Sequence, residues 1–84
     1  MIHQIIAVKD IKAGHFAKPV AVPTDAVGVR AFQDAVNDKS SEYAKHPEDY
    51  EIWNIGTYDD NTGLVSPNVP RQLANAVALL KEFG

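Results

Sequence analysis

The chain has 84 residues and no cysteine, with 45% hydrophobic and 23% charged residues. This length supports one hydrophobic core, so we expect a single domain over residues 1–84 and no catalytic cleft between domains. The lack of cysteine excludes disulfides, thiolate zinc sites and cysteine nucleophiles. The net charge of −3 argues against strong, sequence-independent binding to duplex DNA, because such proteins present a basic surface to the phosphates.

Charge is distributed unevenly along the chain. Residues 1–30 carry four basic side chains against two acidic ones, whereas residues 31–84 carry four against nine. The N-terminal lysines are the one basic group, Lys9, Lys12 and Lys18. The longest apolar run, residues 5–8, is far shorter than the roughly 20 residues that span a bilayer, and no signal-peptide pattern is evident. We therefore expect residence in the cytoplasm and no membrane partner.

The first half of the chain predicts two strands and a helix. Residues 2–8 have strand composition with apolar side chains on both faces, which predicts a central strand. Residues 16–22 resume an extended pattern, and the two prolines there predict a short strand at a sheet edge. A helix should begin near Asp25, capped by Thr24 or Asp25, and end at residues 37–38. Its expected core-facing residues are Ala26, Val29, Phe32, Ala35 and Val36.

The second half predicts a similar order. After one helical turn over residues 40–45, the aromatic and β-branched run 50–58 predicts a strand, in which Gly56 indicates a bulge or a close backbone contact. Residues 59–63 have the composition of a hairpin turn. The return strand is expected to be short because prolines follow it. Apolar residues at spacings of three and four then predict a helix over residues 70–83, with Asn68 as a plausible cap.

The order β-β-α-β-β-α predicts an α+β fold. We expect a mainly antiparallel sheet of about four strands with two helices packed on one face. The other face of the sheet is then left for a partner.

Two acidic stretches could bind metal or act in catalysis. Residues 59–63 are rich in oxygen ligands, but a calcium loop needs alternating ligands over about twelve residues and a distal glutamate, which residues 64–67 do not supply. We interpret this stretch as a turn. His46, Glu48 and Asp49 form the densest group of acids, bases or metal ligands, but a proline among them disrupts a helix, so we favour a solvated loop.

No other pattern points to catalysis. His3 and His15 have no carboxylate nearby in sequence to orient them, and we interpret both as structural. The serines lie outside any Gly-x-Ser-x-Gly elbow, and no glycine-rich phosphate cradle is present. We therefore expect no enzymatic activity, no catalytic residue, no bound metal and no cofactor.

Aromatic residues remain as the candidate binding group. Sheet faces with exposed aromatic rings and lysines at the rim stack single-stranded bases, each stack contributing roughly 1 to 3 kcal/mol. The alternative is that the rings form the core beneath the helices, or a dimer contact, because so small a domain needs its aromatics for burial. The candidate nucleic-acid-binding residues are Lys9, Lys12, Lys18, Tyr50, Trp53 and Tyr58.

Three phrases follow one another at a definite spacing. They are R-A-F-x-D-A-V-N-D at residues 30–38, P-E-D-Y at residues 47–50 and D-D-N-T-G at residues 59–63. With them, the chain resembles the small nonstructural protein of gokushovirus-type microviruses, the open-reading-frame-five family of these single-stranded-DNA phages. The resemblance covers residues 29–63 and continues through Ser66-Pro67 and Pro70-Arg71.

The resemblance implies a virus-encoded, non-capsid protein of the host cytoplasm. Its implied role is in the switch from duplex replication to the production and packaging of single-stranded genomes, and the family offers no catalytic residues to transfer. We therefore expect a non-enzymatic protein that binds single-stranded DNA weakly or docks on viral or host replication proteins. The second hypothesis is a protein-interaction module, as a homodimer, that modulates host or viral proteins without touching nucleic acid.

Overall fold

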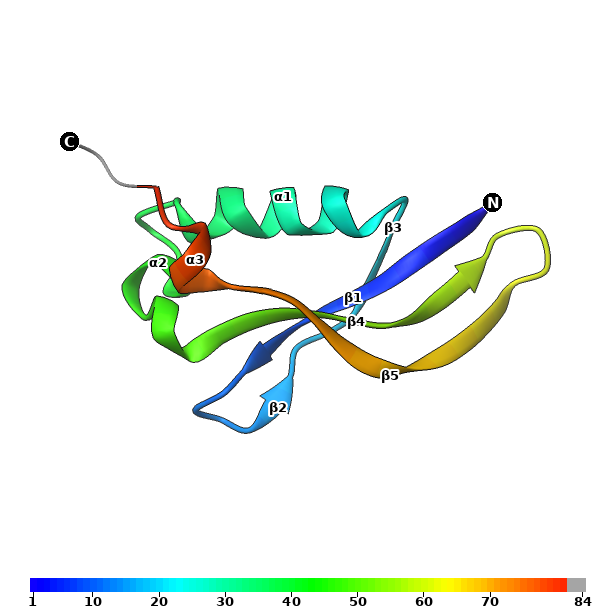
Figure 1. The fold of residues 1–84 in the computed structure, drawn as a ribbon, viewed down its shortest axis with the longest axis horizontal. Coiled ribbons are helices and arrows are strands. Elements are labelled where there is room, and N and C mark those ends of the chain that lie inside the picture. The colour runs from blue at the N-terminus through cyan, green and yellow to red at the C-terminus, as the bar shows by residue number, and fades with distance from the viewer. Residues whose placement is uncertain (82–84) are drawn as a thin grey trace.

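The computed structural model describes residues 1–81, in which a curled antiparallel sheet carries helices on one face (Figure 1). The strands are β1 (Ile2–Asp10), β2 (His15–Phe16), β3 (Val20–Val22), β4 (Tyr50–Asp59) and β5 (Leu64–Asn75). The helices are α1 (Asp25–Val36), α2 (Glu42–Lys45), the 3-10 turn η1 (Pro47–Asp49) and α3 (Ala76–Leu79). The α+β class and the antiparallel sheet are as the sequence predicted. None of the helices in residues 1–81 is long and apolar enough to cross a bilayer.

The sheet is built around β1 and β4. Its order is β2-β1-β4-β5, and β3 pairs with the same edge of β1 as β2 does. The central position predicted for the first strand is therefore confirmed. The single strand predicted over residues 16–22 is instead divided into β2 and β3, because Pro19 lacks a donor, although Ala17 still donates its backbone N–H to the Val8 carbonyl at 2.7 Å.

The hairpin of β4 and β5 begins as predicted and then departs from the prediction. Its turn is confirmed: Gly63 adopts a positive φ of 74° and donates its N–H to the Asp59 carbonyl at 2.7 Å. However, β5 is 12 residues long, so the prediction of a short return strand was wrong. Pro67 and Pro70 are tolerated because β5 is an edge strand whose pairing with β4 shifts register twice.

The predicted C-terminal helix over residues 70–83 was also wrong in extent. Residues 70–75 belong to β5, and α3 has only four residues, while Phe83 lies outside the described residues. Pairing with β4 overrides the helical spacing, since Ala74 lies opposite Ile52 in the sheet. The cap of α3 is Asn75, whose side-chain oxygen accepts the Ala78 N–H at 2.8 Å.

Helix α1 begins and ends as the sequence predicts. The hydroxyl of Thr24 accepts the Val27 N–H at 3.2 Å, and the helix ends at Val36 before Asn37. The predicted core-facing residue Ala26 is exposed, and Gly28 is buried in its place. Helix α2 is the further turn predicted after α1, capped by the Ser41 hydroxyl.

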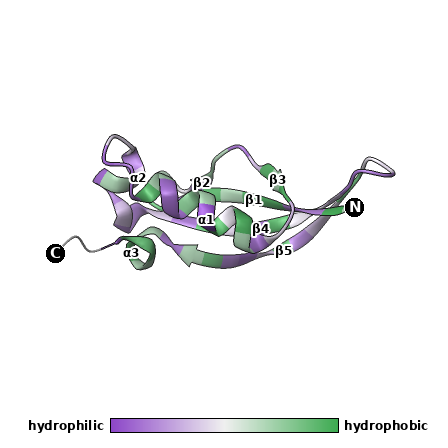
Figure 2. Ribbon diagram, turned by 90° about the horizontal axis from the view of Figure 1, so that it is seen from above, coloured by the Kyte–Doolittle hydropathy of each residue, from purple (hydrophilic) through white to green (hydrophobic). Residues whose placement is uncertain are grey.

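The main hydrophobic cluster lies between the helices and one face of the sheet, and Ala7 of β1 is buried outside this cluster. The buried cluster draws on β1, α1, β4 and α3 and comprises Ile6, Phe32, Val36, Ile52 and Ala76. Figure 2 shows the helices side by side over the sheet, with the hairpin of β4 and β5 reaching beyond them. The described helices therefore leave the second face of the sheet uncovered, as the sequence analysis expected.

Gly56 lies where the sheet is most irregular. The register of β4 shifts against both neighbours beside it, and a Cβ at Gly56 would lie 2.6 Å from the Ser66 carbonyl oxygen of β5. The predicted bulge and the predicted close backbone contact are both present. Gly28 also lacks room for a Cβ, but there the obstacle is the terminal carbon of the Ile6 side chain, which can change rotamer.

We expect Gly56→Ala to lower the free energy of unfolding by about 2 kcal/mol or more, because backbone must move to make room. Gly28→Ala is the matched control: its gain in helix propensity, about 1 kcal/mol, offsets the displacement of Ile6, so its stability should lie within about 1 kcal/mol of wild type. Urea unfolding followed by far-UV circular dichroism measures both. Equal losses for the two variants would contradict this account of Gly56.

Candidate functional site

The face of the sheet opposite the helices, here called the open face, follows from strand alternation. Ile6 and Ile52 belong to the core beneath α1, so their neighbours Ala7 and Trp53, which pair with each other, point to the opposite side. The same alternation places Lys9 and Glu51 on the open face. Tyr58 joins them because the bulge beside Gly56 shifts β4 by one residue and pairs Tyr58 with His3, which shares the face of Ala7 on β1. Residues of β2 and β5 complete it through Phe16, which pairs with Lys9, and Gln72, which pairs with Trp53.

An aromatic cluster lies at the middle of this face. The rings of Phe16 and Trp53 meet edge to face, with centroids 6.0 Å apart and planes at 87°. The ammonium group of Lys9 lies 5.6 Å from the Phe16 centroid and 5.3 Å from the Trp53 centroid, within the range of a cation–π interaction. Phe16 is 38% exposed and Trp53 is half-buried, so both rings retain accessible surface.

Glu51 fixes the edge of this cluster. One oxygen of its carboxylate accepts the Trp53 indole N–H at 3.1 Å, and the other accepts the Gln72 side-chain amide at 3.1 Å. We call the five residues the open-face cluster: Lys9, Phe16, Glu51, Trp53 and Gln72.

Tyr58 lies on the same face toward the hairpin tip. Its ring packs on that of His3 with centroids 5.8 Å apart. His3 Nε2 lies 2.8 Å from one oxygen of Asp60, and the Met1 amino group donates to the other at 2.7 Å. Two hydrogen bonds hold the pKa of the Asp60 carboxyl below its ordinary value. The bond from the Met1 amino group has the larger effect, and the bond from His3 is next. His3 therefore has an acidic partner that lies 57 residues away, which linear sequence does not reveal.

The structure brings together only some of the candidate binding residues. Lys9 and Trp53 meet in the open-face cluster, and Tyr58 shares its face. Tyr50 lies on the opposite side, packed edge to face on Tyr43 with ring centroids 4.8 Å apart. Burial is the main cause that raises the pKa of the Tyr50 hydroxyl. Nearby carboxylates, of which Asp10 has the largest effect, raise it further.

The other two lysines line hollows away from the open-face cluster. Lys12 lies in the turn between β1 and β2 and lines a hollow of about 330 Å³. Lys18 lies between β2 and β3 and lines a smaller, more apolar hollow of about 210 Å³ beside Tyr43 and Ile52.

Gln72 and Glu51 are members of the open-face cluster that sequence reasoning missed. The strand pairing that brings them together with Trp53 cannot be read from consecutive residues.

The hollow at Lys12 also gathers the acidic residues near His46. Its lining is Asp10, Lys12, Ala13, His46, Asp49 and Tyr50. The potential ligand atoms of His46, Glu48 and Asp49 lie within 4.8 Å of one another. Among residues 1–81, this is the group of side chains spaced closely enough to hold a cation. His46 and Glu48 are exposed, as a solvated loop requires. Asp10 joins them because β1 and β4 place it opposite Tyr50, which the sequence analysis did not anticipate.

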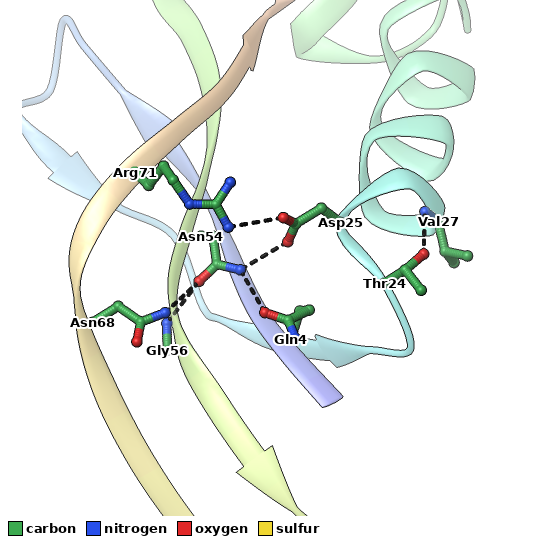
Figure 3. A network of polar contacts seen from close by, with 8 residues as sticks. All are labelled: Gln4, Thr24, Asp25, Val27, Asn54, Gly56, Asn68 and Arg71. Atoms are coloured by element: carbon green, nitrogen blue, oxygen red, sulfur yellow. Dashed lines mark hydrogen bonds and ion pairs between the residues drawn. The ribbon is translucent and has the colours of Figure 1, made fainter. Parts of the chain in front are cut away.

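A network of polar side chains around Asn54 lies on the helix side of the sheet (Figure 3). Asn54 has no exposed surface. Its amide nitrogen donates to Gln4 at 2.9 Å and to Asp25 at 2.8 Å. Its amide oxygen accepts the Gly56 N–H at 3.1 Å and the Asn68 side-chain amide at 3.0 Å. Two donors and two acceptor positions are thereby filled, so Asn54 is a structural residue with no capacity left for a ligand.

Asp25 connects this network to the surface. Its second oxygen accepts from Arg71 at 2.8 Å. The hydrogen bond from Arg71 is the main cause that holds the pKa of the Asp25 carboxyl below its ordinary value of 3.8, and the bond from Asn54 acts in the same direction. The N-terminus of α1 is thus tied to the edge strand β5 through one carboxylate.

A family model described as "Phage ORF5 protein" matches residues 3–79. This chain belongs to the Phage ORF5 protein family. The match runs from the second residue of β1 to the end of α3, so it includes both the open-face cluster and the network at Asn54. Membership makes this a phage protein and confirms the resemblance found in residues 29–63. No curated protein and no solved structure matches the chain.

We expect Asn54→Ala to lower the free energy of unfolding by about 2 to 4 kcal/mol, because it leaves the buried Gly56 N–H and the half-buried Gln4 and Asp25 side chains without this partner. Asn68→Ala, which removes one bond from an exposed residue, is the control and should cost about 1 kcal/mol or less. Urea midpoints measure both variants. A loss for Asn54→Ala no larger than the control would contradict the role of Asn54.

We expect Asp25→Asn to be less stable than wild type at neutral pH. Because the folded-state pKa of Asp25 lies below its unfolded value, this stabilisation is present above the unfolded pKa and is lost as the pH falls through the folded pKa. The difference between wild type and variant should therefore shrink below pH 3.8. Urea unfolding at several pH values tests this, with Asp34→Asn, on an exposed position of α1, as the control.

Proposed function

We propose that this phage protein is a non-enzymatic accessory protein that binds single-stranded DNA weakly through its open face, acting in replication or packaging of the viral genome in the host cytoplasm. The observation that carries the proposal is the open-face cluster: two accessible aromatic rings with a lysine ammonium over both, on a sheet face that the described helices leave uncovered.

The chemistry of the cluster favours unpaired bases. Aromatic rings on an open sheet offer flat apolar surfaces on which bases stack, at roughly 1 to 3 kcal/mol per base. In a duplex the faces of the bases are already stacked on one another, and only their edges and the phosphates are accessible. Trp53, Phe16 and, farther along the face, Tyr58 therefore favour single strands.

The charges of the protein support weak binding. The net charge is −3, and the cluster itself contains one cation and one anion. Of the three candidate lysines, only Lys9 is placed over the aromatic rings. Affinity should therefore come mainly from stacking, and its salt dependence should correspond to few phosphate contacts.

A specific observation favours the second candidate function, a protein-interaction module. The hairpin of β4 and β5 extends beyond α1 (Figure 1). Four exposed apolar residues lie beside its tip, and we call them the apolar hairpin end: Met1 (58%), Ile2 (51%), Leu64 (63%) and Val65 (59%). Apolar surface that gathers at one end of a sheet is suited to a protein partner, which includes a second copy of this chain or a replication protein.

Titration of the protein with an unlabelled oligothymidylate tests the first function. Trp53 is the only tryptophan in the sequence, so its fluorescence reports on the open face. We expect quenching that weakens from 20 to about 200 mM salt. Lys9→Ala should weaken binding about three- to tenfold, since it removes the nearest cation. Lys39→Ala, an exposed lysine between α1 and α2, is the control with the same change of charge.

The result that overturns the first function is an unchanged Trp53 signal with no oligonucleotide bound at low salt. In that case the second function makes its own prediction, which sedimentation equilibrium measures as self-association that depends on concentration. A monomer at all concentrations would exclude the homodimer.

A further inference from the structure

We propose that Glu51 determines which part of a nucleic acid the open face accepts: it orients Trp53 for stacking on an unpaired base, and its negative charge keeps phosphates away from the rings. This inference rests on the proposed single-stranded-DNA binding and adds the residue that makes that binding selective for bases. It assigns Glu51 a positioning and selectivity role, and no catalytic one.

The positioning role follows from a chain of two hydrogen bonds. Glu51 and Trp53 are two residues apart on β4, so their side chains leave the same face of the sheet. The carboxylate holds the indole N–H at 3.1 Å with one oxygen, while Gln72 from the neighbouring strand β5 holds the other oxygen at 3.1 Å. The carboxylate is therefore fixed from two strands, and the indole ring is fixed in turn.

The edge contact with Phe16 completes the orientation of the ring. With Phe16 on one side and Glu51 at the N–H edge, Trp53 is held from two directions before any ligand arrives. A ring that is already ordered loses less side-chain entropy on binding, which favours stacking.

The selectivity role follows from the charges. The two groups that donate to Glu51, an indole and an amide, are neutral, so they satisfy its oxygens without cancelling its charge. The Lys9 ammonium lies over the rings, and its residue pairs with Glu51 across β1 and β4. A phosphate drawn toward Lys9 therefore also approaches a carboxylate, and the two interactions oppose each other.

The ligand that fits this arrangement is a base with its backbone turned outward. The expected class is a short, unpaired segment whose bases reach the rings, rather than a phosphate-rich strand that lies along the sheet. Duplex DNA, which presents phosphates first, should be excluded by the same carboxylate.

The test is Glu51→Gln in the full chain, titrated with an oligothymidylate at several salt concentrations. Glutamine keeps an oxygen for the indole N–H, and the Gln72 amide can turn to match it, so the ring stays in place while the charge is lost. We expect affinity at low salt to rise about three- to tenfold and the slope of log K against log salt to steepen by about one. Near-ultraviolet circular dichroism of Trp53 should not change.

Two further variants separate charge from position. Glu51→Ala removes the charge and also frees the indole, so its affinity should fall below that of Glu51→Gln, and the near-ultraviolet signal of Trp53 should weaken. Glu42→Gln, an exposed position on α2 among the helices, makes the same change of charge away from the open face and should leave affinity and slope as in wild type.

The outcomes distinguish this inference from the function on which it rests. If wild type binds and Glu51→Gln shows the same affinity and slope, the role of Glu51 is overturned and the proposed function stands. If only Glu51→Gln binds, the role of Glu51 is supported and binding by the natural protein is overturned. If neither binds at low salt, both fail.

Discussion

The fold depends on the side-chain amide of Asn54. It is buried without exposed surface and joins β1, the N-terminus of α1, its own strand and β5 through four hydrogen bonds. The other end of α1 is held in a similar way, because Asn37 donates to the Leu79 carbonyl at 3.0 Å and accepts the Lys81 N–H at 2.8 Å. Fixed at both ends by asparagine side chains, α1 stays over one face of the sheet and supplies the core there.

Covering one face leaves the other with a different chemistry. The core needs only a few apolar side chains from each layer, and the largest aromatic residue, Trp53, is left on the open face with Phe16 and Lys9. The open-face cluster and the apolar hairpin end are the two surfaces to which the proposed functions are assigned.

Local sequence signals predicted the parts of the fold that depend on neighbouring residues. The cap at Thr24, the turn that ends at Gly63 and the bulge at Gly56 each arise from backbone conformation or from short-range hydrogen bonds, and each was predicted. The segment after Pro70 was predicted as a helix from its apolar spacing and is mostly strand. In that segment the hydrogen bonds with β4 outweigh helix propensity, and propensity alone contains no information about an available partner strand.

By itself, the sequence determined the α+β class, the central first strand, helix α1 and the family, because alternation, capping and motifs are written in consecutive residues. Alternation along one strand already separates Tyr50 from Trp53, which lie three residues apart. Only the tertiary structure decided that the bulge beside Gly56 brings Tyr58, five residues from Trp53, onto the same open face, and that Gln72 of β5 joins Trp53 there. Register and the choice of covered face are set by contacts between distant segments, and a one-residue difference in pairing would exchange the two faces.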